Sequence, residues 1–307
     1  MRYAWHNDIL IPEKDAKLSI YDEALMFGTV VFEMTRTFNK TILKLHEHFE
    51  RLRMSCQYLE IEIPWKWDYL EYAYEDLIKT NQDEWTNDDE IRGLINVSRG
   101  ILPMYADAGM GKDGTNIIMS CFPLRHVLKD KSWVYSKGIE VVIPRQQALP
   151  EYLLDAKIKS RSRQHYKMAD LQAHKINPDA WALLLDNNGY MAEGTGSNFF
   201  MVKDGDVFTP KGTNCLRGVS RAFIMELCFM RGINCIEKDI TFYDAINADE
   251  VFFTNTPFCI VPIRTIDGHE LGECVGKMTE YLINTWSKRV SCDFVSQARR
   301  WDNDSLD

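Results

Sequence analysis

The sequence predicts two domains of mixed α/β structure. The chain has 307 residues, which exceeds one ordinary domain, and its 45% hydrophobic and 26% charged residues can build sizeable cores. Strand-like runs and helical patterns alternate along most of its length. A polar stretch without clear periodicity covers residues 125–137. We therefore expect a small α/β domain over 1–124, an interdomain linker over 125–137 and a larger mixed-sheet domain over 138–307.

The first domain begins with a predicted hairpin. Residues 29–38 are rich in β-branched and aromatic side chains, and a second short strand follows an Asn-Lys turn. Helical spacing of apolar residues predicts helices over 46–59 and 68–79, and residues 91–100 and 115–124 are typical of strands. The glycine-containing loop between those two strands does not match the phosphate-loop motif.

The second domain combines strands with a few helices. Strands and hairpins are expected over 138–147, 181–186, 197–210, 233–240 and 250–271, with a hairpin turn at 266–269. Helical patterns cover 168–175, 219–232 and 277–290. The tail that runs to residue 307 is expected to be loose.

Charge and composition disfavour several classes of protein. A formal net charge of -9 argues against a nucleic-acid binder, because phosphate contacts need surplus cations. No apolar run approaches the roughly 20 residues of a membrane helix, and the N-terminus lacks the apolar core of a signal peptide. The eight cysteines form no C-x-x-C pair, which predicts a reduced, cytoplasmic protein.

Metal binding is also not expected. His46 and His48 are two residues apart in a helical pattern and therefore do not share a face. We expect both to be surface or capping residues.

Positive charge is concentrated in the stretch KIKSRSRQHYK, residues 157–167. It is consistent with a solvated helix face, a nucleic-acid patch, or a lysine that does covalent chemistry beside an anion. A lysine that forms an imine must be deprotonated part of the time, so its pKa must be lowered by desolvation or nearby cations. Arg161 and Arg163 could supply such a field, which would also suit an anionic cofactor. The residues alone leave these interpretations open.

Two further segments have features of a ligand site. MAEGTGSNFF, residues 191–200, places Glu193 at a glycine-containing turn where backbone can approach a ligand closely. CLRGVSRAF, residues 215–223, opens a helix whose unpaired N–H groups favour an anion. A simple loop would also explain the glycines, and Ser220 could merely cap its helix.

Together these segments resemble the class IV (fold type IV) pyridoxal-phosphate enzymes, most closely the branched-chain amino-acid aminotransferases. The resemblance begins at FGTVVFEMTR (27–36), HEHFERLRMS (46–55) and IRGLINV (91–97). It continues through LLLDNNGYMAEGTGSNFF, LRGVSR, DEVFFTNT and VPIRTIDG, in the same order and spacing. It implies a small α/β domain, a larger pseudo-barrel domain, pyridoxal 5'-phosphate as cofactor, and a homodimer with the active site near the subunit interface.

The resemblance also assigns roles to individual residues. Lys159 matches the Schiff-base lysine, with Lys157 and Lys167 as supporting charges, and Glu193 matches the carboxylate that faces the pyridine nitrogen. The residues implied to hold the cofactor phosphate are Arg51, Val219, Ser220 and Thr256. The implied reaction is a ping-pong transfer between an apolar, branched-chain-like amino acid and a 2-oxo acid such as 2-oxoglutarate, with Lys159 as acid and base.

Several positions depart from the family pattern. Phe27 and Met34 stand where the family has tyrosine and glycine, and Glu90 replaces a tyrosine before the Ile-Arg pair. Pro257, in the turn after a late strand, has no N–H to offer a substrate carboxylate. The tyrosine expected near the cofactor's phenolic oxygen falls on Gln164, for which Tyr166 or His165 could substitute.

These departures leave the substrate open. Arg36, Arg92 and Arg99 are candidate cations for the substrate carboxylate, although all three could be ordinary ion-pair partners. The predicted apolar lining consists of Phe27, Phe32, Met34 and Phe258. The alternatives are an (R)-amine or D-amino-acid transaminase, an aminodeoxychorismate-lyase-like enzyme, and an inactive scaffold with a basic binding surface. The D-amino-acid alternative is weakened because the Arg-x-His pair of those relatives is absent from residues 101–109.

Overall fold

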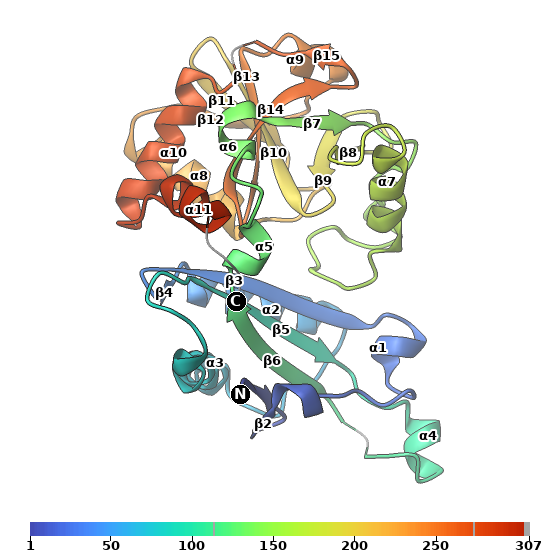
Figure 1. Ribbon diagram of the computed structural model, residues 1–307. Helices are drawn as coiled ribbons and strands as arrows, with labels where there is room; N and C mark the ends of the chain where they lie inside the picture. The colour runs from blue at the N-terminus through green and yellow to red at the C-terminus, as the bar shows by residue number, and fades with distance from the viewer. Residues whose placement is uncertain (113, 273, 304–307) are drawn as a thin grey trace. The chain divides into compact units, whose positions relative to one another are not determined.

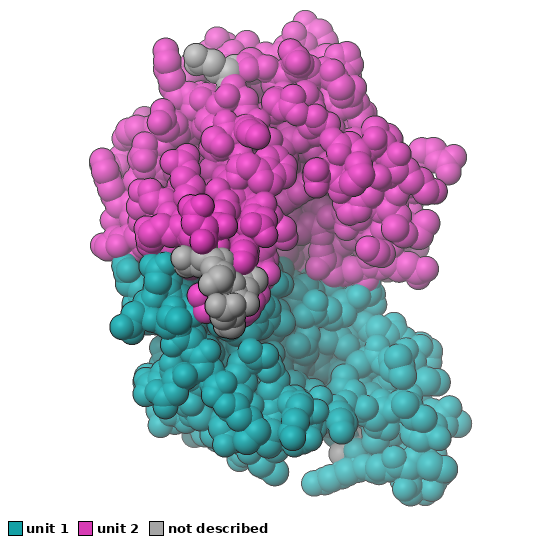
Figure 2. All heavy atoms as spheres, in the orientation of Figure 1, with its two compact units in different colours: residues 1–124, 158–162 teal, residues 125–157, 163–307 magenta. Residues whose placement is uncertain are grey.

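A computed structural model describes residues 1–112, 114–272 and 274–303, and the chain divides into two compact units (Figure 1, with the units coloured separately in Figure 2). Unit 1 comprises Met1–Leu124 and Ile158–Ser162, and unit 2 comprises Arg125–Lys157 and the chain from Arg163 onward. The segment that carries Lys159 therefore belongs to unit 1, although the sequence suggested that it would belong to the larger domain.

The expected linker is also part of a compact unit. Residues 125–137 form the short helices α5 (Arg125–Leu128) and α6 (Val134–Lys137) within unit 2. Leu128, Val134 and Tyr135 are buried, and the Tyr135 hydroxyl donates to the Phe258 carbonyl at 3.0 Å. The apolar residues among the charged ones therefore anchor this stretch, and their burial could not be seen from its polar composition.

Unit 1 is built on an antiparallel sheet with strand order β2-β1-β6-β5-β3-β4. Side chains of β5 alternate between buried and partly exposed, the pattern of a sheet with one covered face. The strands are β1 (Tyr3–His6), β2 (Ile9–Pro12), β3 (Val30–Phe38), β4 (Thr41–Ile42), β5 (Ile91–Ser98) and β6 (Asn116–Pro123).

Helices α2 (Leu45–Tyr58) and α3 (Trp67–Thr80) pack against this sheet. Their apolar stripes supply buried Phe49 and Leu52 from α2 and Tyr74 from α3. A Cβ on Gly93 of β5 would lie 1.6 Å from the Tyr74 hydroxyl, so the close approach of α3 requires glycine there. The shorter helices of the unit are η1 (Glu13–Asp15), α1 (Glu23–Met26), η2 (Gln82–Glu84) and α4 (Pro103–Asp107).

In unit 2, six strands pair in a closed circuit, β10-β13-β14-β7-β8-β9 and back to β10. This closed sheet agrees with the pseudo-barrel that the resemblance implied. Strands β11 and β12 extend the sheet from β10, and β15 pairs with β14. The strands are β7 (Ile139–Val142), β8 (Trp181–Leu185), β9 (Met191–Gly194), β10 (Ser197–Lys203), β11 (Asp206–Pro210), β12 (Cys235–Lys238), β13 (Glu250–Asn255), β14 (Cys259–Ile266) and β15 (His269–Glu270).

The helices of unit 2 cover the outside of this sheet, with α7 on one side and α8, α10 and α11 gathered on another (Figure 1). Their bounds are α7 (Gln164–His174), α8 (Val219–Met230), α9 (Phe242–Ile246), α10 (Lys277–Arg289) and α11 (Phe294–Asn303). Helix α11 corrects the expectation of a loose tail, since its Phe294 and Trp301 are buried. The last four residues, 304–307, lie outside the described part of the chain.

Two surveys of the described residues bear on function. None of the described helices combines the length and apolar character needed to cross a bilayer. Likewise, the part of the chain that the structure describes contains no cluster of three or more histidine, cysteine or acidic side chains that could hold a metal ion. All eight cysteines are free thiols.

Candidate functional site

The backbone around Lys159 pairs with β3 in the manner of a short additional strand. The Phe32 N–H donates to the Lys159 carbonyl at 2.9 Å, and the Arg161 N–H donates to the Val30 carbonyl at 2.7 Å. The Lys159 N–H donates to the Ser55 hydroxyl of α2 at 3.3 Å. The backbone of Lys159 is thus fixed to two elements of unit 1.

The side chain of Lys159 lies against an aromatic ring of the same unit. Its Nζ is 4.8 Å from the centre of the Phe32 ring, and the Arg161 guanidinium lies 3.7 Å from the same centre. A like charge beside an amine disfavours the ammonium form. The two cations share one aromatic ring, and the effect of Arg161 on the pKa of Lys159 stays a prediction.

The other lysines of the basic stretch have different surroundings. Lys157 Nζ is 3.0 Å from Asp155 Oδ2 and 3.5 Å from Glu151 Oε1. The hydrogen bond to Asp155 raises the pKa of Lys157, which keeps its amine protonated. Lys167 is exposed on α7. Lys159 differs from Lys157 in sharing an aromatic ring with a second cation.

Arg51 of α2 is locked into a buried cluster with Glu33 of β3 and His48 of α2. Arg51 Nε and Nη2 donate to the two Glu33 oxygens at 2.7 and 2.8 Å, a bidentate pair. His48 Nδ1 lies 2.7 Å from Glu33 Oε2. His48 is buried, which corrects its assignment to the surface: the helix turns positions 48 and 51, three apart, toward the sheet.

The charges in this cluster follow from its burial. Desolvation by itself would raise the pKa of Glu33, but Arg51 and His48 outweigh it and hold that pKa well below its usual range. Desolvation lowers the pKa of His48, more than Glu33 raises it. His48 is therefore neutral near pH 7 and donates from Nδ1 to an ionised Glu33. The three-residue spacing of His48 and Arg51 in a helical pattern could have indicated that they share a face. Glu33 was missed as a functional candidate.

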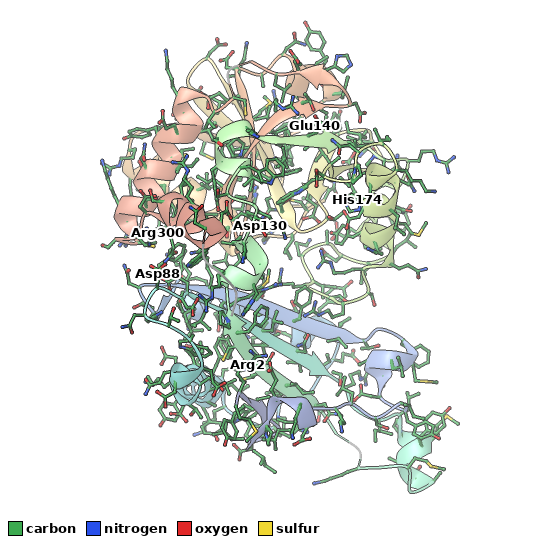
Figure 3. The ribbon with its side chains drawn as sticks, in the orientation of Figure 1. Arg2, Asp88, Asp130, Glu140, His174 and Arg300 are labelled. Carbon is green, nitrogen blue, oxygen red and sulfur yellow. The ribbon has the colours of Figure 1, made fainter. Side chains whose placement is uncertain are left out.

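In unit 2, Glu193 of β9 accepts hydrogen bonds from two neutral donors. The Tyr166 hydroxyl of α7 donates to Glu193 Oε1, and the Leu216 N–H donates to Oε2 at 2.9 Å. Burial and the neighbouring carboxylate raise the pKa of Tyr166 well above its usual value, so it remains a donor. In Figure 3 the label of His174 marks the far end of α7, the helix that carries Tyr166.

Arg163 is fixed near the same carboxylate but pairs with other groups. Its Nη2 donates to the Thr195 carbonyl in the turn after β9, and its guanidinium lies 4.9 Å from the centre of the Tyr166 ring. Gln164, the first residue of α7, is exposed. The structure thus gives Tyr166, rather than Gln164, the contact with Glu193.

The N-terminus of α8 has the character of an anion site. Gly218 precedes the helix without a side-chain cap, and Val219 and Ser220 are buried in the first turn. Ser220 is therefore not the cap that was considered. A Cβ on Gly218 would lie 2.1 Å from Asn198 Oδ1, so a larger residue would require the buried Asn198 side chain to move. These donors fit the phosphate of pyridoxal phosphate, and Glu193 in the same unit fits its ring nitrogen.

The turn after β13 offers few donors. Pro257 has no N–H, and the Phe258 N–H donates to Asn255 Oδ1 at 2.9 Å. Thr256 lies between them and is partly exposed. This turn therefore has less capacity to bind a carboxylate than a turn with unengaged N–H groups.

Several predicted substrate residues share one face of the unit 1 sheet. Phe32, Met34 and Arg36 alternate along β3, and Arg92 lies opposite Arg36 on β5. Arg92 Nε is 2.9 Å from the Met34 sulfur, and the Arg36 guanidinium is 3.9 Å from the centre of the Phe38 ring. Phe27 is 66% exposed and follows α1. In the described chain it is a surface residue.

Glu90, which replaces a tyrosine of the family pattern, has a structural task. Its buried carboxylate accepts from the Thr37 hydroxyl and from the backbone N–H groups of Asn39 and Lys40, the latter two at 2.7 and 3.2 Å. It therefore stabilises the turn between β3 and β4. Arg99 pairs with Glu23 at 3.8 Å, as an ordinary ion pair would.

Comparison with known proteins now decides the family. The model of the family described as "Amino-transferase class IV" matches residues 30–266. The chain belongs to this family. The segments that carry Lys159, Glu193 and Arg51 all lie within the matched range.

Individual relatives agree with this assignment. The chain is 33% identical over 279 residues to a protein of Methanocaldococcus jannaschii named "Putative branched-chain-amino-acid aminotransferase", covering 90% of this chain and 92% of that one. It is 30% identical over 284 residues to the branched-chain-amino-acid aminotransferase of Escherichia coli (strain K12), covering 88% and 87%.

Solved structures of branched-chain aminotransferases share the fold. A crystal structure of the Escherichia coli enzyme has a TM-score of 0.78 at 27% identity, covering 92% of this chain and 91% of that one. The enzyme of Thermobaculum terrenum in its PLP form has a TM-score of 0.80 at 24% identity, covering 98% and 96%. The fold type IV architecture expected from the sequence is confirmed.

Proposed function

We propose that this class IV aminotransferase uses pyridoxal 5'-phosphate to move an amino group between a branched-chain or other apolar L-amino acid and 2-oxoglutarate. The observation that carries the proposal is Lys159, fixed on β3 with its amine against Phe32 and beside Arg161. The relatives named above carry the name of branched-chain aminotransferases. They favour this function over the amine, D-amino-acid and lyase alternatives.

Each of the chain's site residues has a task that its surroundings permit. Bound pyridoxal phosphate supplies a ring that accepts electron density from the substrate α-carbon. Glu193 is held by Tyr166 and Leu216 and would keep the ring nitrogen protonated. The family resemblance assigns the cofactor phosphate to Arg51, Val219, Ser220 and Thr256.

Lys159 would have two tasks. Its ε-amine would hold the cofactor covalently until the substrate amine takes its place. Lys159 would then take a proton from the substrate α-carbon and return it to the adjacent cofactor carbon. A second keto acid would reverse these steps, giving ping-pong kinetics.

A half-reaction screen tests the proposal. Purified holoenzyme is mixed separately with L-leucine, L-glutamate, D-alanine and 3-methylbutylamine, and the visible absorbance of the cofactor is followed. We expect L-leucine and L-glutamate to bleach the band with release of the matching keto acid, and Lys159→Ala to abolish the change. Bleaching by 3-methylbutylamine only or by D-alanine only, or repeated release of ammonia without an acceptor, would contradict the proposal.

We further propose that the protein is a homodimer in the cytoplasm. The family resemblance supports the dimer, and the free cysteines support the cytoplasmic location. Light scattering should give twice the mass of the chain, and a mass equal to one chain would contradict the dimer.

A further inference from the structure

Arg161 has a fixed position next to the reacting lysine. The segment from Lys159 to Arg161 pairs with β3 as a short antiparallel strand, with Ser160 opposite Val31. Alternate residues of a strand point to the same side. The side chains of Lys159 and Arg161 accordingly both reach the ring of Phe32.

The guanidinium of Arg161 is oriented as well as located. Its Nε and Nη2 donate to Asn96 Oδ1 at 3.0 and 2.9 Å, while its central carbon lies 3.7 Å from the centre of the Phe32 ring. Asn96 is directly opposite Phe32 in the pairing of β3 and β5. Both contacts therefore come from the rigid sheet, and a planar guanidinium held in this way presents a fixed set of donors.

We propose that Arg161 binds the α-carboxylate of the amino-acid substrate and so selects amino acids over amines; this inference rests on the proposed function. An α-amino acid bears its carboxylate on the same carbon as its amine. The substrate amine would take the place of the Lys159 amine. The carboxylate, on the same substrate carbon, would then lie close to the position that the Lys159 amine had occupied. Arg161 is the cation that shares an aromatic ring with Lys159, and arginine matches carboxylate geometry.

Other residues are less suited to this task. Arg36 is only 2% exposed, with its guanidinium on the ring of Phe38, whereas Arg161 is exposed. Arg92 is half-buried, with its Nε against the Met34 sulfur. In the turn after β13, Pro257 lacks an N–H and the Phe258 N–H is engaged by Asn255.

The test compares Arg161→Gln and Arg161→Lys with the control Arg53→Gln. Arg53 is an exposed cation of α2, in the same unit, that pairs with Glu50 at 2.9 Å. The first measurement is binding of 4-methylpentanoate, which has the skeleton of leucine without its amine, to each holoenzyme by its effect on the cofactor absorbance. The second is kcat/KM for L-leucine and for 3-methylbutylamine, which is leucine without its carboxylate.

Arg161→Gln should weaken 4-methylpentanoate binding and lower kcat/KM for leucine by about 10- to 100-fold, the range of hydrogen bonds to charged groups. Activity toward the amine should stay within about twofold, because it has no carboxylate to lose. Arg161→Lys should recover part of the loss, since it restores charge without the planar fork. Arg53→Gln should leave all values unchanged.

Three results would overturn the inference. These are 4-methylpentanoate binding by Arg161→Gln equal to wild type, an equal loss toward leucine and the amine, or no binding of 4-methylpentanoate by wild type. Circular dichroism verifies that each variant is folded. If wild type binds 4-methylpentanoate but does not convert leucine, the proposed function fails, while the binding comparison still decides the role of Arg161.

Discussion

Glu33 in unit 1 and Glu193 in unit 2 are both buried carboxylates, but they have opposite surroundings. Glu33 receives a bidentate pair from the Arg51 cation and a third bond from neutral His48. Glu193 receives hydrogen bonds from the neutral Tyr166 hydroxyl and the Leu216 N–H.

The difference fits two roles: Glu33 has a structural one, and the proposed function gives Glu193 a role in the reaction. The charge of Glu33 is compensated by Arg51 within the fold, so its main effect is to fix the position of that arginine. The Tyr166 hydroxyl and the Leu216 N–H are neutral donors that hold Glu193 in place, which suits a group proposed to interact with a protonated ring. Substitution of each carboxylate by its amide should therefore produce different kinds of damage.

Glu33→Gln should cause the largest effect, a loss of stability. Removing one partner of a buried ion pair leaves the other charge uncompensated and typically costs about 3–5 kcal/mol. Urea unfolding followed by circular dichroism measures the loss. Glu50→Gln is the matched control, because Glu50 forms an exposed pair with Arg53 and should change the unfolding midpoint little. Equal midpoints for the two variants would show that the Glu33 cluster is not a stabilising unit.

Glu193→Gln should instead impair turnover while the protein stays folded. The amide keeps the shape but removes the charge that would favour a protonated ring nitrogen, and loss of such a preorganised contact lowers kcat by about 10²–10³-fold. Tyr166→Phe, which removes one donor and no charge, should have a smaller effect of about tenfold. Leucine turnover and the unfolding midpoint are measured together. A Glu193→Gln enzyme with wild-type kcat would exclude the ring-nitrogen role.

The two carboxylates also show what could be learned from sequence. Glu193 lies in a motif with glycines, serine and asparagine, and Lys159 lies in a dense run of cations, so local composition pointed to both. Neither Glu33 nor His48 carried such a mark. Their pairing depends on which face of α2 packs on β3, and that is decided by tertiary contacts.

The surroundings of Glu90 and Lys159 were also hidden in the sequence, because they too depend on tertiary contacts. From its position in the family motif, Glu90 was expected to replace a donor of the substrate site. The sequence did not show that backbone N–H groups of the β3–β4 turn donate to its carboxylate. Lys159 was placed in the larger domain because continuity along the chain does not reveal that five residues cross back to pair with β3. Alternating strands and helices, which depend on local periodicity, were predicted well in both halves.

The smallest expected effect is on how the stability of the fold depends on pH. Glu33 has a folded pKa below its usual value of 4.5, so its contribution to stability is present above that pH and is lost as pH falls further. His48 has a folded pKa below 6.5 because burial disfavours its cation. As pH falls through 6.5, His48 therefore takes up a proton in the unfolded chain but not in the folded chain. The free energy of unfolding begins to fall at this point.

His48→Asn should remove the part of this decline between pH 6.5 and 4.5, while the Glu33 part below 4.5 remains. Urea midpoints measured from about pH 8 to about pH 4 give the slopes. His46→Asn is the control, because His46 should affect the pH dependence of stability in the opposite direction. The hydrogen bond with Glu71 raises the pKa of exposed His46, so protonated His46 stabilises the fold at low pH. Its removal should leave the decline unchanged or slightly steeper. A steeper decline in His48→Asn would mean that His48 is charged in the fold, and the cluster would then hold two cations around Glu33 rather than one.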